Sequence, residues 1–140
     1  DLIHDENMRA LFTFLFNSLS TAHASFKSRT YITPLENQLK QLHLEISNSL
    51  EQKHSIARCA KQLNISESYF QLIYKKLFGI SFQQDLILMR VTRARFNLST
   101  SNLSLSQIAE FCGYNNEVHF YRQFKKLTGV TPAQYRKHPF

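Results

Sequence analysis

The sequence predicts an all-α fold, and three observations support that prediction. Only three glycines and three prolines occur among the 140 residues, so little material is available for loops. Apolar residues recur at three- and four-residue spacing, and no alternating strand pattern competes with this periodicity. The segment Glu67–Ser81 also aligns with Glu117–Thr131, fifty residues later, with Glu, Phe, Lys-Lys, Leu and Gly at the same places in both. A repeat at this period indicates two copies of one supersecondary unit.

Composition and charge narrow the range of partners. An apolar fraction of 43% is typical of a globular protein. Residues 1–50 carry four basic and five acidic side chains, whereas residues 51–140 carry thirteen basic and five acidic ones. This asymmetry directs the second part toward nucleic acid or an anionic surface. No apolar run is long enough to cross a bilayer, so we expect no membrane association.

Enzyme and cofactor chemistry find no support in the sequence. Cys59 and Cys112 fit no metal-ligand spacing and are expected to be reduced structural thiols in a cytosolic protein, with a redox pair as the less favoured alternative. No histidine cluster, nucleophile–base pair, carboxylate pair or glycine-rich phosphate loop is present, and Asp85 and Glu110 look like isolated acids. We therefore expect no cofactor, no metal and no catalysis, and we place phenylalanines and tyrosines in the core by default.

The first third of the chain predicts two helices separated by a linker. Residues 5–19 form an amphipathic pattern typical of a core helix or a helix–helix interface, and residues 20–33 are rich in Ser, Thr and Ala. Thr33-Pro34-Leu35-Glu36 is a strong helix start, because Thr can cap, Pro suits the first position and Glu can reach back to the cap. A helix over 34–49 is expected to follow.

Similar start and stop signals divide the rest of the chain into helices. Serine or threonine stands at six predicted N-caps or capping boxes, and glycine stands where two helices should stop. The start signals are Thr33, Ser55, Ser66, Ser81, Ser104 and Thr131, and the stop signals are Gly79 and Gly129. The predicted helices are 34–49, 55–63, 67–78, 82–98, 105–112, 116–127 and 132–137.

Each copy of the repeat consists of a short helix, a tight turn and a longer helix. The turn residue is Asn64 in the first copy and Gly113 in the second, and a small alanine stands four residues before each. The alanine lets the second helix cross closely, and the turn residue must accept a positive φ. Phe70 and Phe120 are then placed to fill the angle between the helices. This combination, found twice, is the helix-turn-helix pattern.

The second copy and its surroundings, Ser106–Arg136, resemble the signature of the DNA-binding domain of AraC/XylS-type transcriptional regulators. The resemblance covers about residues 36–137. It implies two helix-turn-helix subdomains bridged by the 82–98 helix, with recognition helices 67–78 and 116–127 in successive major-groove segments. The chain departs from the family pattern at Asn64, Asp85 and Leu72, where Gly, Tyr and a polar or basic residue are usual.

The resemblance also implies a division of the chain and a set of partners. Residues 1–19 would be the terminal helix of an N-terminal regulatory or dimerisation domain, residues 20–33 a linker, and residues 34–140 the bipartite DNA-binding domain. Double-stranded DNA in the cytoplasm is the implied partner. RNA polymerase, a second copy through residues 5–19, and a small-molecule effector bound by the preceding domain are the further candidates.

The candidate contact residues lie on the faces opposite the predicted apolar stripes. Arg122 can grip guanine and Gln71 can grip adenine with paired hydrogen bonds, and Leu72 and Val118 can pack on thymine methyl groups. The family's base-contact positions map onto Ser68, Gln71, Leu72, Val118, His119, Tyr121 and Arg122. Phosphate contacts are predicted for Ser66, Lys75, Lys76, Arg90, Asn116, Lys125 and Lys126. For Arg90 a structural role is an equal alternative.

A second reading of the same features is a non-catalytic basic helical module that binds protein or RNA. Lysine pairs on helix faces are commonly no more than solvated charge. Such a module would show a shallow apolar groove and no pair of basic helices spaced to match the DNA groove.

Overall fold

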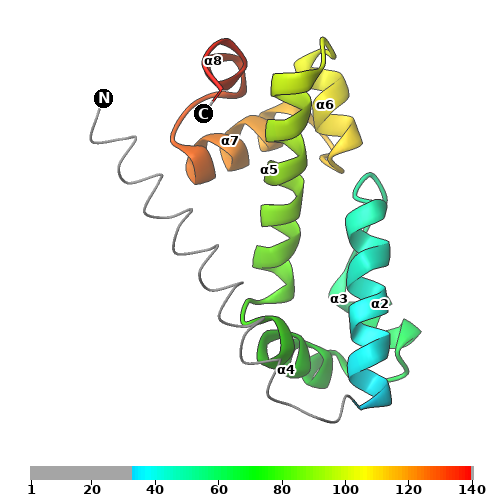
Figure 1. Ribbon diagram of the computed structural model, residues 1–140. Helices are drawn as coiled ribbons and strands as arrows, with labels where there is room; N and C mark the ends of the chain where they lie inside the picture. The colour runs from blue at the N-terminus through cyan, green and yellow to red at the C-terminus, as the bar shows by residue number, and fades with distance from the viewer. Residues whose placement is uncertain (1–32, 140) are drawn as a thin grey trace.

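The structure, a computed structural model, describes residues 33–139 as seven α-helices with no strand among them (Figure 1). The predictions for residues 5–19 and for the linker lie outside this range. The helices are α2 (Pro34–Asn48), α3 (Ile56–Gln62), α4 (Glu67–Phe78), α5 (Phe82–Thr100), α6 (Leu105–Phe111), α7 (Glu117–Thr128) and α8 (Pro132–Lys137). Every helix predicted from residue 34 onward is confirmed, with ends shifted by no more than two residues.

Local capping explains why these helices begin and end where they do. The side chains of Thr33, Ser55, Ser66, Ser81, Ser104, Asn116 and Thr131 each accept a backbone N–H from the first turn of the helix that follows. Ser104 with Gln107 and Thr131 with Gln134 form complete capping boxes. Gly79 and Gly129 adopt the left-handed conformation at the ends of α4 and α7, as predicted.

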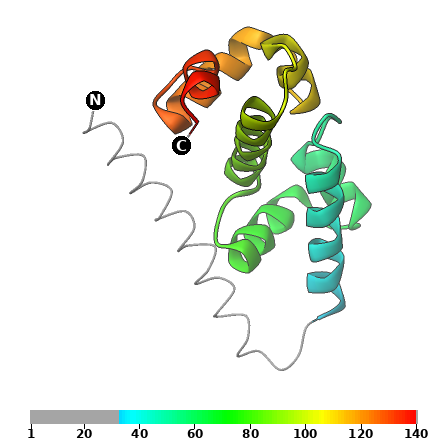
Figure 2. The same cartoon turned by 45° about the horizontal axis from the view of Figure 1, so that its top comes forward.

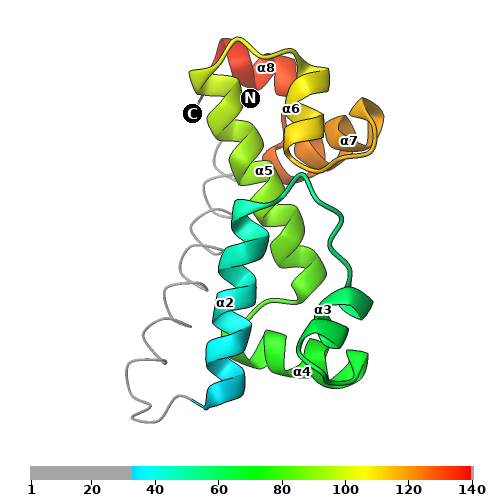
Figure 3. The ribbon, with the colours of Figure 1, turned by 90° about the vertical axis from the view of Figure 1, so that its right-hand side faces the viewer.

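Two hydrophobic cores lie along α5, which takes part in both. Figures 2 and 3 show α4 near the beginning of α5 and α6 and α8 toward its end. The first core joins α2, α3 and α4 to the beginning of α5, and the second joins the remainder of α5 to α6, α7 and α8. Phe70 and Phe120 are fully buried at equivalent places in the two cores, as the repeat predicts. Figure 3 shows α3 and α4 near one end of α5 and α6 and α7 near the other, projecting from the same side.

Asp85 is not the isolated acid that the sequence suggested. Its carboxylate is buried, accepts a hydrogen bond from the hydroxyl of Tyr74 at 2.5 Å, and lies 3.1 Å from Nε2 of His43. Burial, followed by the neighbouring Asp85 carboxylate, raises the pKa of Tyr74. The ring of His43 stacks on Phe78. This cluster joins α2, α4 and α5, and its buried carboxylate makes it a structural feature of the first core.

Within residues 33–139, the default placement of aromatic residues in the core was wrong at three positions. Tyr69, Phe96 and Phe111 are exposed on the outer faces of α4, α5 and α6. The physical reason is that each of these side chains points away from the core beside it, so a large apolar group there meets solvent. In α5, whose two halves bury different faces, Phe96 lies off the face formed by Val91, Ala94 and Leu98.

Cys59 and Cys112 are free and buried in different cores, as expected of structural thiols. In the part of the chain that the structure describes, no helix combines the length and apolar character needed to cross a membrane.

Candidate nucleic-acid interface

The two turns take the backbone conformation that the repeat requires. Asn64 has φ 56° and Gly113 has φ 88°, so both lie in the left-handed region. In each unit the N–H group just after this residue donates to the carbonyl of the small alanine, from Ile65 to Ala60 at 3.0 Å and from Tyr114 to Ala109 at 2.9 Å. The angle between the short and long helices is therefore set by equivalent backbone bonds in both units.

The predicted contact residues of α4 come together around one hollow in the surface. Phe70 and Tyr74 are buried, which leaves the opposite face of the helix in solvent. A hollow of about 660 Å³ forms on that face, and Leu72 beside it is 65% exposed. Five predicted residues line it: Ser68, Gln71, Leu72, Lys75 and Lys76. We call this feature the α4 hollow.

The outer face of α7 carries the second predicted set. Phe120 and Phe124 are fully buried, and Val118 is 59% exposed on the other side. The ring of His119 meets the buried ring of Tyr114 edge-on, with 5.5 Å between centroids, so the turn supports this side chain from below. The remaining predicted residues of this helix, Tyr121, Arg122, Lys125 and Lys126, are all exposed.

The predicted phosphate contacts occupy both ends of each recognition helix. Ser66 and Asn116 cap α4 and α7, and their side-chain oxygens accept the N–H groups of Tyr69 and His119. Each Lys pair lies in the last turn of its helix, where a positive charge also interacts favourably with the helix dipole. The backbone N–H groups of the first turns are the groups suited to an anion such as phosphate.

Arg90 differs from the other predicted phosphate contacts because it is partly buried. Its guanidinium carbon lies 5.7 Å from the centroid of the Tyr114 ring, and burial lowers the pKa of Arg90. Its Nε is buried without a hydrogen-bond partner among residues 33–139. This packing favours the structural alternative, and a phosphate contact by Arg90 stays a prediction.

Two candidates escaped the sequence-based prediction. Tyr69 is exposed on α4 at the place where α7 carries His119, and the repeat alignment alone could have identified it. Gln83, in the first turn of α5, lines the α4 hollow, and only the packing of α5 beside α4 reveals it. No group of three or more His, Cys, Asp or Glu side chains within residues 33–139 is arranged to hold a metal ion.

Comparison with known proteins identifies the family. A family model described as a helix-turn-helix domain matches residues 59–138. The HTH-type transcriptional regulator YtdP of Bacillus subtilis is 34% identical over 92 residues, which are 66% of this chain and 12% of YtdP. The arabinose operon regulatory protein of Escherichia coli is 27% identical over 104 residues, which are 74% of this chain and 36% of that protein. The chain thus spans a small part of each relative.

A solved structure shows the same arrangement of helices. The DNA-binding domain of AdpA, described as a global transcriptional factor in complex with a target DNA, matches 71% of this chain and 90% of that one. The TM-score is 0.69 and the sequence identity is 27%. Since the family model covers more than half of the residues and the relatives are regulators of the same type, this chain belongs to the AraC/XylS family of helix-turn-helix transcriptional regulators.

Proposed function

We propose that this chain binds double-stranded DNA sequence-specifically, with α4 and α7 in successive major-groove segments, and that it regulates transcription. The observation that carries the proposal is the pair of equivalent 12-residue helices near the two ends of α5, each with an exposed face and a terminal Lys pair. Lysines in the last turn of each helix can neutralise phosphates. The exposed side chains that precede each Lys pair on the same helix face outward, where they can contact base edges.

The two recognition helices carry different chemistry at equivalent positions. In the repeat alignment Ser68 corresponds to Val118, and Leu72 corresponds to Arg122. The face of α4 therefore offers a hydroxyl followed one turn later by an apolar side chain, whereas that of α7 offers an apolar side chain followed by a guanidinium. Apolar groups suit the thymine methyl and a guanidinium suits guanine. We infer two half-sites of unlike sequence, not a repeated one.

The experiment that tests the proposal is selection of bound duplexes from a random DNA pool at about 150 mM salt, followed by sequencing. Two enriched blocks with centres about 10 bp apart are expected, because that is one helical turn. A single block would mean that one helix alone reads bases. Absence of enrichment, with binding lost steeply as salt rises, would leave only charge attraction and contradict the proposal.

Two matched variants of α7 separate base contact from phosphate contact. Arg122→Ala should cost about 1–3 kcal/mol of binding and relax the preference at one base pair. Lys125→Ala should weaken binding to all sequences alike and make the salt slope shallower by about one. Binding measured across a panel of single-base variants and salt concentrations distinguishes the two outcomes. An equal loss on every sequence would make Arg122 a phosphate contact instead.

The exposed Phe96 and Phe111 support a second candidate function, a helical module that binds protein or RNA. Replacing both phenylalanines with serine would leave DNA selection unchanged under the main proposal. For the full-length protein we include in the proposal a cytoplasmic location, RNA polymerase as a partner, and an effector-binding or dimerising region that involves residues 1–19.

A further inference from the structure

The two helix-turn-helix units are joined by a second connection besides α5. We propose that Ser47–Glu51, Arg93 and Gly113 form a brace that fixes the spacing and phase of α4 and α7, so that both helices read DNA as one rigid unit. The inference rests on the proposed function and deepens it, because it assigns Arg93 and Gly113 as positioning residues that touch no DNA.

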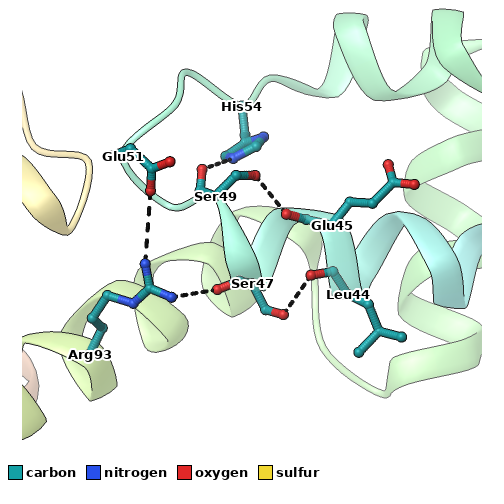
Figure 4. Close-up of polar contacts among 7 residues, drawn as sticks. All are labelled: Leu44, Glu45, Ser47, Ser49, Glu51, His54 and Arg93. Atoms are coloured by element: carbon teal, nitrogen blue, oxygen red, sulfur yellow. Dashed lines mark hydrogen bonds and ion pairs between the residues drawn. The ribbon is translucent and has the colours of Figure 1, made fainter.

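The first part of the brace is the side chain of Arg93, near the middle of α5. Its Nη2 donates to the carbonyl of Ser47 at 2.8 Å, and its Nη1 lies 3.9 Å from a carboxylate oxygen of Glu51 (Figure 4). The Ser47 carbonyl belongs to the last turn of α2, where carbonyls have no partner further along the helix. The hydrogen bond to the Ser47 carbonyl holds the guanidinium at the end of α2, and the longer ion pair with Glu51, whose side chain is partly exposed, adds a weaker contact to the loop that follows. Arg93 thus ties the end of α2 to α5.

The loop after α2 is held in place by its own contacts. The Ser49 hydroxyl donates to the carbonyl of Glu45 at 2.6 Å, and Nε2 of His54 donates to the carbonyl of Ser49 at 2.7 Å (Figure 4). Leu50 is buried in the first core. With the loop anchored on both sides of Leu50, the carbonyl of that residue has a fixed position.

The second part of the brace is the contact between Leu50 and Gly113. A Cβ placed on Gly113 would lie 2.0 Å from the Leu50 carbonyl oxygen and 3.1 Å from Nε of Arg90. Only a residue without a side chain fits there. Gly113 is the turn residue between α6 and α7, so a loop of the first unit lies directly against the turn that orients the second recognition helix. Contact between backbones, unlike contact between long side chains, leaves little freedom to slide.

A rigid reader should be sensitive to the distance between its two DNA blocks. One inserted base pair moves a block by about 3.4 Å along the duplex and about 35° around it. A chain with fixed units would then lose base contacts of one helix, which corresponds to at least about tenfold weaker binding. A chain whose units move independently would follow the displaced block at little cost.

The test compares two duplexes that carry the selected blocks, one with the native spacing and one with a single inserted base pair. We expect the wild-type chain to bind the inserted duplex at least about tenfold more weakly, and Arg93→Met to reduce that ratio to about threefold or less. Arg95→Met is the matched control, since it removes the same charge from the same helix. Arg95 donates to the Tyr135 hydroxyl at 3.1 Å, within the second core, so this variant should keep the wild-type ratio.

The ratio between the duplexes is informative because a general loss of stability or charge lowers both affinities alike. Equal ratios in Arg93→Met and wild-type protein would overturn the inference, and so would a wild-type chain that binds both duplexes equally well. Gly113→Ala repeats the test from the second unit, after circular dichroism has shown that the variant folds. If the chain enriches no sequence, the proposed function itself is overturned. That failure is distinguishable from a failure of the brace, because no enriched blocks are then available for the spacing comparison.

Discussion

The hydroxyl of Tyr74 should contribute far more stability than an exposed hydrogen bond. In Tyr74→Phe the carboxylate of Asp85, which is only 4% exposed, loses the donor at 2.5 Å and retains His43 at 3.1 Å. Hydrogen bonds to charged groups contribute about 1.5–3 kcal/mol, and a closed site gives water little chance to replace the donor. We expect the free energy of unfolding to fall by about 2–3 kcal/mol.

The complementary variant, Asp85→Ala, leaves the hydroxyl of a fully buried Tyr74 without its acceptor, at a cost of about 1–3 kcal/mol. It also removes a negative charge near the beginning of α5, which contributes about 0.3–1 kcal/mol. The double variant leaves neither group unpaired. The loss of unfolding free energy in the double variant should therefore be smaller than the sum of the losses in the two single variants by about 1.5–3 kcal/mol.

Urea unfolding at pH 7, followed by far-UV circular dichroism, measures these three free energies. An unchanged slope of the unfolding free energy against urea concentration shows that the variants expose as much surface on unfolding as the wild type. His43→Ala is the control, because that side chain is 29% exposed and water can replace it, so the loss of unfolding free energy should be about 1 kcal/mol. Single costs that add within about 0.5 kcal/mol, or a neutral Tyr74→Phe, would refute the reasoning.

Three further predictions concern the turns and the thiols. Gly113→Ala should destabilise the protein by at least about 2 kcal/mol more than Asn64→Ala. Both variants place alanine at positive φ, but only the alanine at position 113 meets a backbone carbonyl. Equal losses of stability in thermal unfolding would disprove that close contact. Burial raises the pKa of the Cys112 thiol to about 11, so the folded state keeps a proton that the unfolded chain releases from about pH 9 upward. Stability should be unaffected by this group below about pH 9 and fall as pH rises to about 11, and Cys112→Ala should show a flatter decline in denaturation curves over that range. Cys59 and Cys112 should react with a thiol reagent only after unfolding, and rapid labelling of the native protein would contradict their burial.

The candidate site was largely predictable because the two recognition helices are amphipathic and repeated. Once Phe70 and Phe120 are assigned to the cores, helical geometry alone decides which residues face outward, and Leu72 and Val118 are indeed exposed. Gln83 was not predictable, because it comes to the α4 hollow from another helix. Whether any of these side chains contacts a base or a phosphate stays a prediction.

The positions of the helices and their ends follow from local sequence, since caps such as Ser104 and turns such as Asn64 depend on hydrogen bonds between residues a few positions apart. The role of Asp85 depends instead on packing between distant segments, because its partners lie 11 and 42 residues away in the chain. The same is true of the two turns, which share a backbone conformation but have different neighbours. Asn64 is exposed and can carry a side chain, whereas Gly113 lies against the carbonyl of Leu50 and cannot. Local bonding selects a conformation, but packing between distant segments decides which side chains that conformation can hold.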